Sequence, residues 1–351
     1  MQETQDRVTI AWLDYARYLG MYLVIWCHVF QGLPRQSSSL ILLAHVIYLF
    51  HMPLFFIISG FLYKPANSNF LTGILRLLLP YFLYQLIYLP IAYTRFLNTD
   101  NNDVFFKLMM GIIMGDGYDT SISYFDCIPC WFIICIIHLR LLFKLMKLNK
   151  FSALFISTLS VIILCVLENY RIDLWCCIDC SLLAVPYFCL GYYLRRFDFM
   201  GIISKNSVLM ILLLLSLPYV LLLLFRVNGP SQMILPSWGN NIILNYLAGV
   251  CGSIMIFITS LFLAKIFGEN KSVYIISRNT LFIIFFHILC IYPFHWVFRH
   301  FDIITGWGFI IQLVITSLIS FIIIFFSEEC IGHLKNKLPL LFGVLPNQIR
   351  K

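Results

Sequence analysis

The 351-residue chain is 61% hydrophobic and 17% aromatic, and only 11% of its residues are charged. Soluble proteins carry about 25% Asp, Glu, Lys and Arg, so this chain has too few charges to cover a water-facing surface. The composition excludes a soluble enzyme, a disordered protein and a secreted disulfide-rich domain, and it predicts an integral membrane protein. The net charge of +8 does not indicate nucleic-acid binding, because the basic residues are scattered as short flanks of apolar runs.

The apolar runs predict the membrane spans, because a helix needs about 20 mostly apolar residues to cross the hydrocarbon core. Ten runs fit this length. They cover residues 10–32, 40–62, 77–96, 129–147, 152–168, 181–195, 207–225, 241–264, 275–297 and 307–326. A further apolar run, at residues 104–114, is too short to cross. We expect it to form a re-entrant or interfacial helix on the outer side.

The basic residues predict the orientation of these spans. With both termini in the cytoplasm, 17 of the 24 Lys and Arg residues fall in inner segments and 6 in outer segments, as the positive-inside rule requires. The first run is longer than a signal segment and lacks a small-residue cleavage site, so we expect it to be retained. The expected fold is one all-α domain over residues 1–351, a polytopic bundle of about ten transmembrane helices with a short cytoplasmic tail at 327–351.

The first span carries three ionisable residues, Asp14, Arg17 and His28. Each is a functional-site hypothesis, because such groups cost roughly 2.5 to 3.5 kcal/mol inside a membrane. Eleven helical steps place Arg17 and His28 on one face, about 16 Å apart along the axis. Arg17 then lies near the cytoplasmic boundary, where it suits an anion, and the deeper His28 suits a general base. The structural alternatives are a membrane anchor paired with Asp14 and an interhelical hydrogen bond from His28.

The second span carries His45 and His51. Pro53 removes a backbone donor there and is expected to kink the helix, which tends to open a polar cavity. His51 is therefore a candidate site residue, and a hydrogen-bonded histidine beside a structural kink is the alternative. Other ionisable residues in spans are more often structural, namely His138, Arg140, His287 and His295.

Half of the twelve cysteines lie inside apolar spans, where a thiol behaves as a small hydrophobe. Two CxxC pairs, Cys127 with Cys130 and Cys177 with Cys180, fall at predicted outer ends of spans, and Cys176 lies beside the second pair. Such pairs bind zinc, form disulfides in an oxidising compartment, or stay as ordinary thiols. All three interpretations are open, and we expect no bound metal.

Several segments, in the same order along the chain, carry the signature of a known family. Arg17, ten further residues and then His28 form the first of these segments. The others are LFHMPLFFIISGFLY (49–63), LRLLLPYFLY (75–84), PCWFI (129–133), YFCLGYYLRR (187–196) and GENKSVYIISRNTLFIIFFH (268–287). Together they resemble the acyltransferase 3 family of multi-pass membrane acyltransferases, in its fucose 4-O-acetylase-like branch. The resemblance covers about residues 10–325.

The resemblance implies an O-acetyltransferase of the cell (inner) membrane. Its donor would be cytoplasmic acetyl-CoA, and its acceptor a hydroxyl of an envelope or surface carbohydrate such as an exopolysaccharide, an O-antigen or a capsule-type glycan. Acetyl is the expected group, and succinyl is the alternative. No permanently bound cofactor and no nucleic acid are expected.

The resemblance also implies roles for individual residues. Arg17, Arg76 and Lys64 would bind the phosphates of the donor, because guanidinium groups suit phosphate. Relatives often carry a second basic residue three positions before the one that matches Arg76, but this chain has Gly73 there.

His28 would deprotonate the sugar hydroxyl, while His51 or a nearby donor stabilises the oxyanion. A transient acyl-histidine is an alternative route. We expect Asp14, Trp131 and His287 to support the site, with Trp131 stacking on sugar or anchoring the membrane interface.

Two other functions fit a chain of this kind. Buried His and Arg residues in ten spans also suit a transporter or exporter of a glycan or another small polar substrate. The sequence shows no convincing inverted repeat, which disfavours this alternative. A non-catalytic partner of a polysaccharide synthase is the third possibility.

Overall fold

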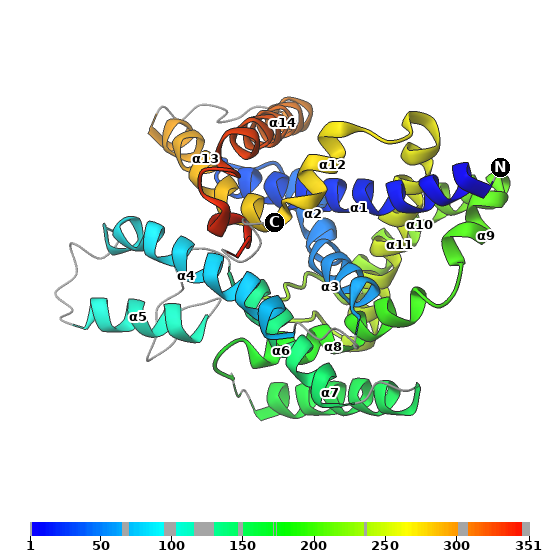
Figure 1. Ribbon diagram of the computed structural model, residues 1–351, viewed down its shortest axis with the longest axis horizontal. Coiled ribbons are helices and arrows are strands. Elements are labelled where there is room, and N and C mark those ends of the chain that lie inside the picture. The colour runs from blue at the N-terminus through cyan, green and yellow to red at the C-terminus, as the bar shows by residue number, and fades with distance from the viewer. Residues whose placement is uncertain are drawn as a thin grey trace. The chain divides into compact units, whose positions relative to one another are not determined.

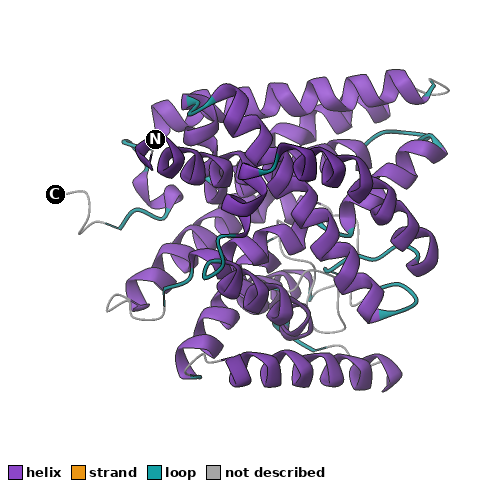
Figure 2. Ribbon diagram, turned by 90° about the vertical axis from the view of Figure 1, so that its right-hand side faces the viewer, coloured by secondary structure: helices purple, strands orange, loops and turns teal. Residues whose placement is uncertain are grey.

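The computed structural model of the chain consists of helices joined by short connections (Figures 1 and 2). It describes residues 2–64, 70–94, 103–115, 130–146, 150–170, 172, 174–234, 237–300 and 308–345. Within these ranges there is no β-strand, and one isolated bridge joins Gln232 to Ser237. The all-α architecture predicted from composition is therefore confirmed.

The chain forms two compact units. Unit 1 comprises Met1–Ile57, Tyr193–Ser231 and Trp238–Leu334. Unit 2 comprises Ile58–Tyr192, Gln232–Ser237 and Lys335–Lys351. The earliest and the latest helices of the chain therefore belong to the same unit.

Unit 1 is built around its first helix. Its helices are α1 (Gln2–Gln31), α2 (Ser38–Tyr48), the first half of α3 (His51–Leu62), α9 (Phe199–Lys205), α10 (Ser207–Asn228), α11 (Ile242–Phe267), α12 (Lys271–Arg278), α13 (Thr280–His300) and α14 (Phe309–Leu334). Helix α1 packs against α2, α11, α12, α13 and α14 (Figure 1). Ala16, Met21 and Ile25 on α1 are consequently fully buried. A helix surrounded by other helices can carry ionisable side chains away from lipid.

Helices α2 and α3 form one apolar stretch with a break at Leu49 and Phe50. Pro53 lies in the first turn of α3, where its missing N–H costs no helical hydrogen bond. The kink expected at Pro53 is therefore a break just before it. This break places Tyr48 at the end of one helix and His51 at the start of the next.

Unit 2 contains the rest of α3, then α4 (Phe70–Thr94), α5 (Val104–Met114), α6 (Trp131–Leu145), α7 (Lys150–Tyr170), α8 (Ile178–Leu194) and a 3₁₀ turn (Pro339–Phe342). An aromatic cluster ties α6 to α8, since the Phe143 and Phe188 rings stack 4.9 Å apart. Tyr63, just after α3, packs edge-on against Phe188 at 5.5 Å. Helix α5 has the bounds predicted for the short run, and its place at the membrane surface stays a prediction.

Among the described residues, seven helices are long and apolar enough to cross a membrane. These are Ser38–Leu62, Phe70–Tyr93, Phe151–Tyr170, Ser207–Asn228, Ile242–Phe267, Thr280–His300 and Phe309–Leu334. The other three expected spans are helices too, but α1 contains Asp14 and Arg17, and α6 and α8 have only 15 and 17 residues. A multi-pass protein is thus established, while the count of about ten spans and the orientation stay predictions.

Gly60 provides a test of the packing in unit 2. A Cβ atom at this position would lie 2.0 Å from the backbone oxygen of Phe188. We therefore expect Gly60→Ala to lower the free energy of unfolding by about 1 to 3 kcal/mol, because the contacting atom belongs to backbone. Thermal unfolding of the purified protein in detergent measures the change.

Gly332 on α14 is the matched control, since nothing lies within 4 Å of a Cβ there. Alanine is about 1 kcal/mol better than glycine inside a helix, so Gly332→Ala should leave stability equal or slightly higher. Equal melting temperatures for Gly60→Ala and the wild type would contradict the close packing of α3 on α8.

Candidate functional site

His28 lies in the last turn of α1 and is held by two polar neighbours. Its Nδ1 atom lies 3.3 Å from Oε1 of Gln31, which is three residues later on the same helix face. The amide nitrogen of Gln31 in turn donates a hydrogen bond to the hydroxyl of Tyr48 at the end of α2. The arrangement links His28 to the break between α2 and α3.

The hydrogen bond to Gln31 fixes which nitrogen of His28 carries the hydrogen. An amide oxygen can only accept, so in the neutral ring Nδ1 must be the donor. Nε2 then holds the lone pair and can take a proton from a substrate. Gln31 thus orients His28 as the third member of a catalytic triad orients its base.

His287 on α13 faces His28, with ring centroids 5.3 Å apart. It is fully buried, and its Nδ1 donates to the backbone oxygen of Ile283 at 2.8 Å. Its Nε2 has no hydrogen-bond partner among the described residues. Two imidazolium rings at this distance would repel each other, so the two rings are not protonated at the same time.

His51 is buried at the start of α3, and its Nδ1 donates to the backbone oxygen of Ile47 at 3.1 Å. In the neutral ring Nε2 is therefore an acceptor, so His51 can donate to an oxyanion only as an imidazolium. Tyr48 packs edge-on against His51 at 5.1 Å. The Tyr48 oxygen accepts from Gln31, which leaves its own O–H free to donate. Tyr48 is therefore a candidate for the nearby donor, and no sequence pattern had pointed to it.

The end of α1 is anchored by later helices. His295 on α13 donates from Nε2 to the backbone oxygen of His28 at 3.0 Å. Gln312 on α14 accepts from the backbone N–H of Ser37 at 3.0 Å and donates to the backbone oxygen of Arg35 at 3.2 Å. These bonds hold the turn between α1 and α2 and so fix the position of His28 relative to Tyr48.

A second polar cluster lies near the middle of α1. Asp14 is buried, and its Oδ1 accepts a 2.7 Å hydrogen bond from the hydroxyl of Ser277. The same oxygen lies 3.6 Å from Nε of Arg278 and 4.0 Å from Nη1 of Arg17. The pairing of Arg17 with Asp14 was the structural alternative considered for Arg17, whereas the contribution of α12 was not expected. Asp14 therefore holds two guanidinium groups close together.

The remaining predicted site residues belong to unit 2. Lys64 follows α3 and Arg76 lies on α4, and both side chains are exposed. Trp131 begins α6 and is 4% exposed, with its ring edge-on to Phe132. The relation of these three residues to Arg17 and His28 stays a prediction.

Gly73, where a second basic residue was missing, contacts an arginine of another helix. Arg140 on α6 donates from Nη1 to the backbone oxygen of Gly73 at 3.2 Å. The same nitrogen lies 3.6 Å from the place where a Cβ of residue 73 would be. Arg140 therefore places a basic group against α4 one turn before Arg76, although none is encoded there.

The eleven cysteines of the described residues are all free thiols. Cys177 donates to the backbone oxygen of Gly115 at 2.9 Å, and Cys135 lies 3.7 Å from the backbone oxygen of Cys177. Cys127 lies outside the described residues. The described part contains no group of three or more His, Cys, Asp or Glu side chains that could hold a metal ion.

Comparison with known proteins assigns the chain to a family. The acyltransferase domain model of the acyltransferase 3 family matches residues 10–328. The chain belongs to this family. No curated protein and no solved structure matches it. With the seven long apolar helices of its described part, the protein is a multi-pass membrane acyltransferase.

The geometry gives this membrane acyltransferase two chemically different places on one helix. His28, with Gln31, Tyr48, His51 and His287 around it, offers a base and hydrogen-bond donors for acyl transfer. The arginines near Asp14 offer positive charge for an anionic group.

Gln31 is expected to be a positioning residue for acyl transfer. Gln31→Leu removes the acceptor that holds Nδ1 of His28, so we expect kcat to fall at least about tenfold with little change in KM. Gln31→Glu keeps an acceptor at that place and should recover most of the rate. Steady-state kinetics of the purified variants measure both effects.

Gln36→Leu is the matched control, because the amide of Gln36 donates to the backbone oxygen of Phe30 and, within the described part of the chain, to no other group. It should leave kcat unchanged. If Gln31→Glu is as slow as Gln31→Leu, an orienting hydrogen bond to His28 is not the function of Gln31.

Proposed function

We propose that this membrane acyltransferase moves an acetyl group from cytoplasmic acetyl-CoA to a hydroxyl of an envelope or surface carbohydrate. The enzyme would be an O-acetyltransferase of the cell membrane that modifies an exopolysaccharide, an O-antigen or a capsule-type glycan. The family supports acyl transfer, and the nature of donor and acceptor is the proposed part. The observation that carries the proposal is the His28 base, oriented by Gln31 and facing His287.

The donor is proposed to enter from the inner side. Arg17 lies on α1 within the segment that the positive-inside rule places near the cytoplasm. Acyl-CoA carries several phosphate charges, and guanidinium groups bind phosphate in a planar, bidentate way. Arg76 and Lys64, both exposed, are proposed to add positive charge for the same phosphates.

The proposed transfer step uses Nε2 of His28, the ring nitrogen that is not bonded to Gln31. Nε2 takes the proton of the sugar hydroxyl while the sugar oxygen attacks the thioester carbonyl carbon. The carbonyl electrons move to its oxygen, and the O–H of Tyr48 or a protonated His51 stabilises that oxyanion. The C–S bond then breaks, the ester remains on the sugar, and the CoA thiolate takes the proton back from His28. Attack by His28 itself, through an acyl-histidine, is the alternative route.

The acceptor is proposed to bind at the outer end of α1. His28 lies 11 residues beyond Arg17, which is about 16 Å further along the helix. The predicted topology therefore places the base toward the outer face, where envelope glycans are found. Trp131 is retained as a sugar-stacking candidate in unit 2.

Replacement of His28 tests the base directly. We expect His28→Ala to reduce acetyl transfer by about 10²- to 10⁴-fold, the usual loss when a general base is removed. Mass spectrometry of glycans from cells that carry each variant, with membrane abundance matched, measures the loss.

The control for His28 is His333→Ala, an exposed histidine at the end of α14, which should transfer acetyl at the wild-type rate. Wild-type acetylation by His28→Ala would refute the role of His28 as base. Movement of glycan across the membrane without CoA release would instead identify a transporter.

Arg17→Ala tests the donor site. Loss of a guanidinium that binds phosphate should raise KM for acetyl-CoA at least about tenfold and leave the acceptor KM unchanged. Kinetics with the acceptor saturating separate the two constants. An unchanged KM together with an unchanged rate would exclude phosphate binding by Arg17.

A further inference from the structure

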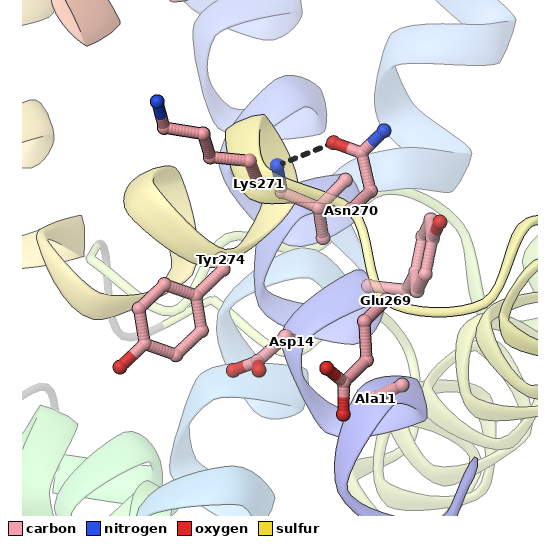
Figure 3. A pocket seen from close by; sticks show the side chains of 8 residues that line it. Ala11, Asp14, Glu269, Asn270, Lys271 and Tyr274 are labelled. Carbon is pink, nitrogen blue, oxygen red and sulfur yellow. Dashed lines mark hydrogen bonds between the residues drawn. The ribbon is translucent and has the colours of Figure 1, made fainter. Parts of the chain in front are cut away.

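A cavity of about 420 Å³ opens beside the arginine cluster of unit 1. It lies between the first half of α1 and the segment that leads into α12 (Figure 3). Its polar lining includes Asp14, Tyr15, Glu269, Asn270 and Tyr274. The volume falls in the usual range of small-molecule sites, about 300 to 1,000 Å³. Both segments that form it are predicted to lie on the inner side of the membrane.

Two arginines lie next to this cavity, on the Asp14 carboxylate that lines it, although neither of them is a lining residue. Asp14 holds both Arg278 and Arg17 through a single oxygen, and the two guanidinium groups are close enough to repel each other. Arg278 contacts Asp14 through Nε, so its two terminal nitrogens pair with no described side chain. Guanidinium nitrogens in this arrangement can bind a phosphate in a bidentate way. The arginine pair next to the cavity therefore suits a group that carries two or more negative charges.

The interior of the cavity has a different chemistry from the arginine pair next to it. Figure 3 shows the Asp14 carboxylate between Tyr274 on one side and Glu269 on the other. The Tyr274 ring also lies below the Arg278 guanidinium, 5.3 Å from its centre. Asn270 accepts from the backbone N–H of Val273, which leaves its NH₂ group to donate. Aromatic faces, carboxylate acceptors and an amide donor together suit a neutral purine nucleoside with an amino group and hydroxyls.

We propose that this cavity binds the nucleotide end of the acyl-CoA donor, with its phosphates on Arg17 and Arg278. The adenine would stack on Tyr274, and its amino group and the ribose hydroxyl would donate to Glu269 or Asp14. This assignment rests on the proposed acyl-CoA donor and adds a second arginine and a nucleoside site to it. From here the donor arm extends along α1, over the roughly 16 Å between Arg17 and His28.

The nucleotide assignment is tested with the full-length protein in detergent and three probes. CoA is used for equilibrium binding, which requires no turnover. Acetyl-CoA and acetyl-pantetheine are used as donors, and acetyl-pantetheine lacks the nucleotide. Arg278→Ala is expected to raise the Kd of CoA and the KM for acetyl-CoA at least about tenfold. With acetyl-pantetheine, which has no phosphate for Arg278 to bind, kcat/KM should fall by clearly less than it does with acetyl-CoA.

Two further variants keep the test interpretable. Arg278→Lys retains a charge beside Asp14 but loses the planar guanidinium group. We therefore expect an intermediate rise, of about threefold, in the Kd of CoA and in the KM for acetyl-CoA. This variant carries the test if the alanine variant does not fold. Arg196→Ala is the matched control, since Arg196 is another predicted inner-side arginine of unit 1 that lies over a tyrosine ring, 5.4 Å from the centre of Tyr193. It should bind CoA as the wild type does.

The possible outcomes distinguish a failure of the cavity assignment from a failure of the proposed function. Equal Kd values of CoA for the Arg278 variants and the wild type would overturn the cavity assignment, and so would an equal rise of KM with both donors. Absence of CoA binding by the wild type would overturn it as well. If CoA binds through Arg278 but no acetyl reaches a glycan, the assignment stands and the proposed function fails.

Discussion

The buried carboxylate of Asp14 is the constraint on which the rest of unit 1 depends. A lone carboxylate in a protein interior facing lipid would be costly, so its negative charge has to be matched within the protein. Ser277 and Arg278, on a helix more than 260 residues later, provide most of that match. The pairing therefore fixes α12 against α1, and it also sets Arg17 beside Arg278. A requirement of membrane burial thus creates the concentration of positive charge that an anionic donor needs.

The last turn of α1 shows how neutral groups can prepare a base without a carboxylate. Each of His28, His51 and His287 uses Nδ1 in a hydrogen bond to an oxygen that only accepts. Their second nitrogens are consequently all acceptors in the neutral rings. Polar side chains in a membrane protein are tolerated when they are paired in this way. Among the described residues, the buried side-chain nitrogen without a hydrogen-bond partner is Nε2 of His287, and it lies next to the proposed base.

Much of the architecture could be predicted from the sequence, because apolar runs and charged flanks directly reflect the membrane. The short helix at Val104–Met114, the pairing of Arg17 with Asp14 and the interruption near Pro53 all follow from local pattern. Gln31 could have been found as well, since it lies three residues from His28 on the same helix face. The contacts of Arg278, Ser277 and Arg140 could not be predicted, because their partners are distant in the sequence and only packing brings them together. The glycine at position 73 removes a charge from the motif, and Arg140 of another helix donates to the backbone oxygen of that glycine.

The bonds from His295 and Gln312 to the turn after α1 also bear on how the protein is made. The first helix is synthesised first, yet the residues that hold its last turn come from the final two long helices. Contacts of such long sequence separation form late, because the chain between them must be in place before they can close. The nascent protein therefore holds an incomplete site in the membrane until α13 and α14 have inserted. A chain cut short before these helices would keep every residue of the Arg17 and His28 motif and still lack the geometry for catalysis.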